Sequence, residues 1–301
     1  METSGYHLPV LLQEVIDLLQ IRPNGTYVDA TFGGGGHSRA ILEKLGPEGR
    51  LIVFDQDEDA YANRIQDERV TFVQQNFRHL QRFLRLHKAT PDGILADLGV
   101  SSHQFDTGAR GFSTRFDGPL DMRMDNRGDK TAADILKKYP EKQLQLLFQE
   151  FGEVTNAKTL AQTIVSQRKS NTLRTINEFK SMIQPVVKGN PAKYLAQVFQ
   201  ALRIEVNDEM GALKDLLTQS AEVLQPDGLL AIITFHSLED RLVKNFMKNG
   251  AFETPDDQNF LAETPPKVFS LVTKKPVTAT DTELKNNSRS RSAKLRVAKK
   301  L

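Results

Sequence analysis

The chain has 301 residues, of which 39% are hydrophobic and 26% charged, a balance typical of a globular protein with a sizeable core. No run of 18 apolar residues occurs, and residues 1–10 lack a basic region followed by an apolar run, so neither a membrane helix nor a secretory signal is expected. The net charge is only +2, and the absence of cysteine excludes disulfides and thiolate chemistry and favours a cytoplasmic location.

The first hundred residues alternate between strand-like and helix-like segments. Short apolar runs predict strands at 26–31, 50–55, 70–73 and 94–98, and the segments between them predict helices at 10–19, 37–45 and 60–65. Such alternation, with short continuous apolar strands, is typical of a parallel sheet that is covered by helices on both faces. The sequence therefore predicts an α/β fold.

The middle of the chain has a different pattern. A loop rich in Gly, Arg and Asp follows Phe105, and the sequence then predicts helices at 131–139, 141–151, 156–168, 176–187 and 191–206. Pro191 behind Asn190 is typical of a first-turn proline after a capping residue. This stretch predicts an all-helical insertion at the carboxyl end of a strand, which is the ligand-binding edge of an open parallel sheet.

The α/β pattern resumes in the last third of the chain. A helix at 207–224 and a strand at 229–235 are predicted, followed by two β-prone segments at 268–272 and 294–297 that predict an antiparallel pair. We therefore expect a discontinuous core of residues 1–105 and 206–301 around a helical domain of residues 106–205. Seven basic and no acidic residues lie after 284, which indicates either a solvated tail or a phosphate-contacting arm.

A glycine-rich loop follows the first predicted strand, between Asp29 and His37, and includes Gly33, Gly35 and Gly36. Glycines let a backbone approach a ligand closely, and Asp55, at the end of the next strand, is placed to accept both hydroxyls of a ribose. The loop lacks the Lys-Ser/Thr pair of a phosphate-binding loop. Asp29 suits the positive charge of S-adenosylmethionine better than a pyrophosphate, although an NAD-dependent oxidoreductase remains open on these residues.

Polar residues also follow two later strands of the predicted sheet. Asp97, with Ser101, Ser102 and Gln104, follows one of them, and His236 follows the other. Both groups are expected at the edge that binds the cofactor, and an aromatic at Phe77 is placed to cover an adenine. The strained elbow of serine hydrolases is absent, and no paired metal-ligand spacing such as H-E-x-x-H occurs, so no metal is expected.

Several long motifs closely resemble the bacterial 16S ribosomal RNA (cytosine-N4)-methyltransferases. They are GTYVDATFGGGGHSRAILEKLGPEGRLIVFDQD from Gly25, DGILADLGVSSHQFD from Asp92, RGFSTRFDGPLDMRMD from Arg110, FHSLEDRLVK from Phe235 and SRSRSAKLRVA from Ser288. The sequence departs from the family pattern at His103 and Asn287, where the family usually has proline.

The resemblance implies a Rossmann-like, S-adenosylmethionine-dependent methyltransferase core with an inserted helical domain for substrate recognition. It implies cofactor contacts at Gly35, Gly36, His37, Asp55, Phe77, Asp97 and Gln104. It also implies a target cytosine in the decoding centre of 16S rRNA in the small ribosomal subunit. Whether the enzyme acts as a homodimer does not follow from the sequence.

The chemistry of amino methylation constrains the roles of these residues. Methylation at cytosine C5 normally needs a cysteine thiolate, which this chain lacks, whereas methylation of N4 needs only alignment and acceptors for its N–H bonds. We expect Asp97 to accept those bonds, assisted by Ser101 or Ser102. The residues expected to contact RNA are Arg110, Arg115, Arg123, His236, Arg289 and Arg291. A non-catalytic RNA-binding factor for ribosome assembly remains the other alternative.

Overall fold

The computed structural model describes residues 8–170, 172–253 and 266–301, and its contacts divide the chain into two compact units. The first unit consists of Met1–Gly99 and Gly211–Leu301, and the second of Val100–Met210. These boundaries lie a few residues from those expected at 105/106 and 205/206. Within the described ranges, no helix is both long and apolar enough to cross a membrane.

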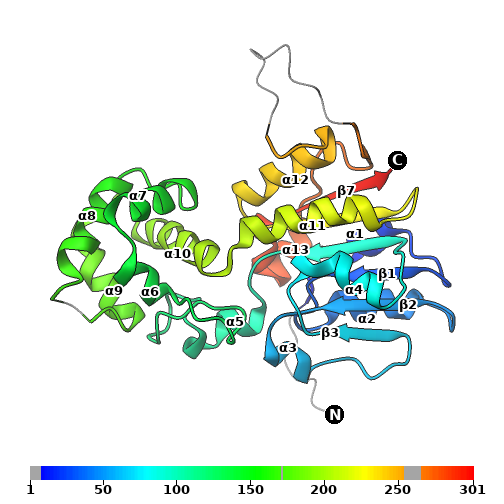
Figure 1. Ribbon diagram of the computed structural model, residues 1–301, viewed down its shortest axis with the longest axis horizontal. Coiled ribbons are helices and arrows are strands. Elements are labelled where there is room, and N and C mark those ends of the chain that lie inside the picture. Colours follow the sequence, from blue (N-terminus) through cyan, green and yellow to red (C-terminus); the bar gives the residue numbers. More distant parts are fainter. Residues whose placement is uncertain (1–7, 171, 254–265) are drawn as a thin grey trace. The chain divides into compact units, whose positions relative to one another are not determined.

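The first unit is built on a seven-stranded sheet in the order β3-β2-β1-β4-β5-β7-β6 (Figure 1). The strands are β1 (Thr26–Asp29), β2 (Arg50–Phe54), β3 (Val70–Val73), β4 (Gly93–Asp97), β5 (Leu229–Thr234), β6 (Phe269–Leu271) and β7 (Lys294–Lys300). Strands β1 to β5 pair in parallel, while β7 runs antiparallel to both β5 and β6. Strand β1 lies between β2 and β4, where the strand order reverses and where ligands bind in open α/β sheets. This is the Rossmann-like α/β fold expected from the sequence.

Helices cover both faces of this sheet. Alternate strand residues point to opposite faces, so that Ile52 and Phe54 belong to one hydrophobic core and Leu51 and Val53 to the other. Helices α4 (Leu80–Leu86), α11 (Glu209–Val223) and α12 (Ser237–Asn249) contribute apolar residues to the first core, and α1 (Leu12–Leu19) and α2 (Gly36–Lys44) to the second. The remaining elements of this unit are α3 (Glu58–Ala62), η1 (Phe77–His79), α13 (Asp281–Asn286) and η4 (Ser288–Ser292).

The end of the chain contains both a confirmed and a missed strand pairing. The antiparallel pairing of β6 with β7 confirms the prediction from the two β-prone segments. The pairing of β7 with β5 was not predicted, and it places the basic segment 294–300 inside the sheet.

The predicted helix at 60–65 was wrong in its bounds, because Asp57 accepts a hydrogen bond from the amide of Asp59 and so starts α3 earlier, at Glu58.

The second unit consists mainly of helices packed around a core of its own. They are α5 (Ser102–Asp106), η2 (Gly108–Arg110), α6 (Ala132–Lys138), α7 (Glu141–Glu150), α8 (Ala157–Gln167), α9 (Ile176–Ile183), η3 (Gln184–Val186) and α10 (Pro191–Asn207). The core includes Leu144, Phe148 and Phe179, each fully buried. The predicted cap is confirmed, because the Asn190 side chain accepts a hydrogen bond from the Lys193 amide.

Asn287 joins the two ends of the first unit. Its side chain is 9% exposed and donates to the Leu8 carbonyl over 3.0 Å, and its own amide donates to the Glu283 carbonyl over 2.6 Å. We expect Asn287→Ala to lower the free energy of unfolding by about 1 kcal/mol, the typical value of one hydrogen bond. Asn287→Pro should cost more, because proline has no amide hydrogen and its φ, near −65°, does not match the −137° found here.

Urea denaturation of the three proteins measures both losses. Asn286→Ala, at an exposed neighbouring position, is the control and should leave stability almost unchanged. A proline variant as stable as the wild type would mean that these two hydrogen bonds do not form.

Candidate active site

Asp29 ends β1 and holds the loop that follows. It is 1% exposed, and its oxygens accept hydrogen bonds from the Thr31 amide over 3.1 Å and from the Ser38 hydroxyl over 2.6 Å. The carboxylate therefore ties the start of the glycine loop to α2, which begins at its other end. This gives Asp29 a structural role, whatever charge it presents to a ligand.

The glycines of the loop adopt conformations that other residues avoid. Gly33 and Gly35 have φ values of 52° and 75°, in the left-handed region. A Cβ on Gly35 would lie 2.7 Å from Cζ of Phe32, and a Cβ on Gly36 would lie 2.2 Å from Cγ of Pro9. The loop is therefore compressed against its own aromatic residue and against the N-terminal segment, which fixes the start of α2.

We expect Gly35→Ala to lower the free energy of unfolding by about 2 kcal/mol, because the left-handed φ disfavours alanine and the Phe32 ring must move. Gly34→Ala is the matched control, since Gly34 is exposed and its φ is not positive. Chemical denaturation compares the two variants. Equal losses for both would contradict the strain argument.

Asp55 follows β2 and points back at the glycine loop. One of its oxygens accepts a hydrogen bond from the Gly33 amide over 2.7 Å, and the other accepts one from the Asp57 amide over 2.9 Å. Burial of the carboxyl raises the pKa of Asp55 to about 6, against the lowering effect of these two amides. Each carboxylate oxygen has a further lone pair, so Asp55 can still accept two hydroxyl groups.

Phe77 lies in the neighbouring loop, at the start of η1 after β3. It is half-buried against the core that α4 and α11 share. The Asn76 side chain caps η1 through the Arg78 amide, and it donates to the Gln56 side chain over 2.9 Å. This bond joins the loops that follow β2 and β3, so Asp55 and Phe77 lie on adjoining segments.

Asp97 ends β4, directly beside the carboxyl end of β1. Its amide donates to the Thr31 hydroxyl over 2.7 Å, and its Oδ2 lies 3.9 Å from Nδ1 of His37. Oδ1 is buried and has no hydrogen-bond partner among the residues that the structure describes. Burial raises the pKa of Asp97 well above the usual value, and Asp29 and Glu239 raise it further. The glycine loop, Asp55 and Asp97 thus meet at the carboxyl ends of β1, β2 and β4.

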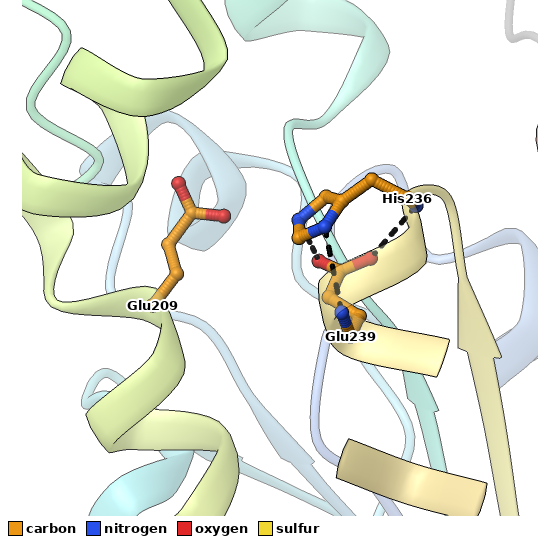
Figure 2. Close-up of side chains that lie close together, drawn as sticks. All are labelled: Glu209, His236 and Glu239. Carbon is orange, nitrogen blue, oxygen red and sulfur yellow. Dashed lines mark hydrogen bonds and ion pairs between the residues drawn. The ribbon is translucent and has the colours of Figure 1, made fainter. Parts of the chain in front are cut away.

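His236 follows β5 and caps α12 (Figure 2). Its Nδ1 accepts a hydrogen bond from the Glu239 amide, and its Nε2 lies 3.1 Å from Oε1 of Glu239, which is 2% exposed. The other Glu239 oxygen accepts hydrogen bonds from the Phe235 and His236 amides. His236 was predicted as an RNA contact, and in the structure it orders the turn after β5.

Three of the predicted site residues in the second unit lie at the start of α5: Ser101 is the capping residue before the helix, and Ser102 and Gln104 are on it. The Ser101 hydroxyl accepts a hydrogen bond from the Gln104 amide, and the Gln104 side chain accepts one from the Ser101 amide. This reciprocal pair is a capping box that starts the helix at Ser102. Ser101 and Gln104 therefore have a structural function on this helix, besides the roles predicted for them.

The predicted arginines differ in exposure. Arg110 is 9% exposed and donates to the carbonyls of Arg123 and Met124, and Arg123 itself pairs with Asp121 over 2.7 Å. These two arginines have structural roles in the loop. Arg115 is exposed, and its guanidinium lies 5.3 Å from the centre of the Phe105 ring.

The two C-terminal arginines that were predicted to contact RNA lie on η4, where Arg291 is exposed and Arg289 half-buried.

Sequence reasoning missed three other groups at the site: the Thr31 hydroxyl, the Val10 carbonyl that accepts a hydrogen bond from His37, and the buried Glu239. Only Glu239 carried a usable signal, because it stands three residues after a capping position.

Comparison with known proteins identifies relatives along nearly the whole chain. The sequence profile of the MraW methylase family matches residues 4–301. A Bacteroides thetaiotaomicron protein named Ribosomal RNA small subunit methyltransferase H is 54% identical over 299 residues, covering 98% of this chain and 97% of that protein. Proteins of the same name from Parabacteroides distasonis and Flavobacterium johnsoniae are 53% and 51% identical, and each alignment covers 99% of this chain and at least 98% of the relative.

Proposed function

The chain belongs to the MraW methylase family and is a methyltransferase, and we propose that it methylates the exocyclic N4 amino group of a cytosine in 16S rRNA, with S-adenosylmethionine as the donor. The observation that carries the proposal is the end-to-end similarity, at about half identity, to proteins named Ribosomal RNA small subunit methyltransferase H. Family membership also decides against the NAD-dependent oxidoreductase activity, which the glycine loop alone left open.

The residues at the carboxyl ends of the strands fit this cofactor. The left-handed backbone at Gly33 and Gly35 lets the loop approach a ligand without side chains in the way. Asp55 offers two carboxylate oxygens for ribose hydroxyls, and Phe77 offers an aromatic surface for adenine. When bound, S-adenosylmethionine supplies the methyl group, and its sulfur keeps the electron pair of the broken C–S bond.

We assign the group that acts on the amine to Asp97. Its Oδ1 is a buried acceptor without a partner in the described part of the chain, and a carboxylate in that position can accept a hydrogen bond from the cytosine N4 group. Accepting that bond orients the nitrogen lone pair towards the methyl group and compensates the charge that nitrogen gains as its new C–N bond forms. The absence of cysteine is consistent with an amino group as the target, since no covalent step on the ring is needed.

The RNA contacts that we propose are those predicted arginines that have no structural role in a loop and are at least partly exposed. Arg115 in the helical unit and Arg291 on η4 are exposed, and Arg289 is half-buried beside it. Guanidinium groups bind phosphates through paired N–H donors. We assign substrate recognition to the unit Val100–Met210 together with η4.

Affinity for S-adenosylhomocysteine is expected to fall as the pH drops through about 6, the pKa of Asp55. Below that pH the carboxyl gains a proton and becomes a poorer acceptor for two hydroxyls, while above it the carboxylate is ionised. Calorimetric titration on both sides of this pH measures the change. Asp55→Asn has no carboxyl group to titrate at position 55, so it should bind S-adenosylhomocysteine more weakly and with an affinity that does not change near pH 6. A wild-type affinity independent of pH would contradict the role of Asp55 in binding the ribose.

The function is tested by restoring the modification in cells and in a purified system. Mass mapping of 16S rRNA from a strain lacking this protein should reveal one cytosine short of a methyl group, and the wild-type gene should restore it. Small subunits and free rRNA from that strain, incubated with the purified protein and a labelled donor, show which of the two is the substrate. No transfer to either would favour the non-catalytic assembly factor instead.

A further inference from the structure

The ring of His37 has two different neighbours, one at each nitrogen. His37 is 6% exposed, its Nε2 lies 2.9 Å from the carbonyl oxygen of Val10, and its Nδ1 lies 3.9 Å from Oδ2 of Asp97. A carbonyl oxygen can only accept a hydrogen bond, so Nε2 must carry the hydrogen. Burial lowers the pKa of His37, which favours the neutral ring. In this tautomer Nδ1 has a lone pair and faces the carboxyl group of Asp97.

The Val10 carbonyl is held in place from the far end of the chain. The Leu11 amide donates to the Glu283 carboxylate over 2.8 Å, and the Asn287 side chain donates to the Leu8 carbonyl over 3.0 Å. Pro9 lies against Gly36, where a Cβ would overlap its ring. The segment 8–11 is thus fixed on both sides of Val10, and the tautomer of His37 follows from the fold.

Two acidic groups also act on Asp97. Asp29 at the end of β1 and Glu239 on α12 both disfavour a negative charge on it. Asp29 already accepts hydrogen bonds from Ser38 and Thr31, and Glu239 accepts them from backbone amides and lies beside His236. Among the residues that the structure describes, His37 presents a bare acceptor to the second oxygen of Asp97, and that lone pair can receive an O–H hydrogen bond once Asp97 is protonated.

We propose that His37 is a positioning residue whose Nδ1 lone pair makes Asp97 the acceptor of the proton that the substrate amine releases. This inference rests on the proposed function for the identity of the amine. As the N4–C bond forms, the nitrogen becomes positively charged, its N–H bond breaks, and the proton forms an O–H bond with the Asp97 carboxylate. Both charges disappear in this step. The proton then leaves to solvent through the Asp97 side chain, which is 23% exposed.

The tautomer is tested first, in the full wild-type chain without any ligand. Histidine ¹⁵N chemical shifts at neutral pH should show, for His37, a hydrogen on Nε2 and none on Nδ1. Of the signals from the six histidines, the one that disappears in His37→Gln belongs to His37. A His37 that carries hydrogen on Nδ1, or on both nitrogens, would overturn the proposal without any reference to activity.

The effect on Asp97 is tested with His37→Gln, whose amide can still donate to Val10 but places no atom at Nδ1. The pH titration of Asp97 is followed by NMR in protein labelled with ¹³C at aspartate Cγ, and its signal is assigned with Asp97→Asn. The midpoint of this titration should move to lower pH in His37→Gln. Leu144→Ala is the control, since it removes a fully buried side chain from the core of the second unit and should lower the melting temperature without moving the midpoint. An Asp97 midpoint unchanged by His37→Gln would contradict the role of Nδ1.

Turnover separates this proposal from the function on which it rests. His37→Gln should lower saturated methyl transfer about tenfold, and the acidic limb of its pH profile should move with the Asp97 midpoint. If the wild type transfers methyl groups and the variant keeps its rate and profile, the inference about His37 fails while the function stands. If the wild type transfers none, the function fails as well.

Discussion

Asp97→Asn is expected to lower methyl transfer at saturating cofactor by about 10²- to 10⁴-fold, the usual range for loss of an acid–base group. The amide has nearly the shape of the carboxylate but cannot take a proton, so the amine remains charged as its new bond forms. The buried Oδ1 and the position at the end of β4 are the observations behind this expectation. The measurement is single-turnover methyl transfer to small subunits that lack the modification.

Asp55→Asn provides the contrast for this experiment. Asp55 contacts the glycine loop rather than the amine, so its variant should raise the dissociation constant of the cofactor and leave saturated turnover closer to normal. If Asp97→Asn behaved like Asp55→Asn, with weaker cofactor binding and near-normal saturated turnover, Asp97 would be a binding residue. The role given to its carboxylate would then be wrong.

Asp240→Ala should lower the free energy of unfolding by about 3 kcal/mol, because it leaves a buried arginine without its carboxylate partner. Arg296 on β7 is 9% exposed, and it donates to Asp240 through Nε over 2.6 Å and through Nη2 over 3.2 Å. The Lys294 ammonium lies 3.3 Å from the same carboxylate. Without Asp240, the guanidinium stays next to the sheet and, within the described ranges, has no ionic partner.

Urea denaturation followed by circular dichroism measures this loss, and Asp227→Asn is the matched control, since asparagine, like aspartate, tolerates the left-handed φ of 63° at this position. Asp227 also pairs with a lysine of β7, Lys299, over 2.7 Å, but its side chain is 78% exposed and the pair is screened by water. We expect little change from the control. A loss in Asp240→Ala as small as that of the control would mean that Arg296 finds other partners or reaches solvent.

Strands with continuous apolar runs were predictable from the sequence, whereas the charged strand β7 was predicted only over 294–297 and without its pairing to β5. The run LLAIITF places β5 almost to the residue, because each of its residues from Leu229 to Thr234 is buried. The segment KLRVAKK of β7 looks like a solvated tail by its charges. It joins the sheet because Asp240, 56 positions away, neutralises Arg296, and no local pattern reveals that pairing.

The acidic residues of the site were also predictable, because carboxylates at the ends of parallel strands meet at one edge. Asp29, Asp55 and Asp97 all end or follow such strands. The partner of His37 could not be predicted, since it is a backbone carbonyl and any residue type could supply it. The same holds for Arg110, whose charge suggested phosphate binding but whose partners are backbone carbonyls within the loop.

Strands β4 and β5 lie side by side in the sheet, although the end of β4 at Asp97 and the start of β5 at Leu229 are separated along the chain by the whole helical unit. A connection of roughly 130 residues makes this pairing slow if the intervening chain is unstructured, because loop closure must precede the contact. Helical contacts are local and form quickly, so early folding of the insertion would shorten the effective loop. The helical unit therefore has a consequence for kinetics: the order in which the two units assemble sets how long the edges of β4 and β5 stay unpaired and open to aggregation.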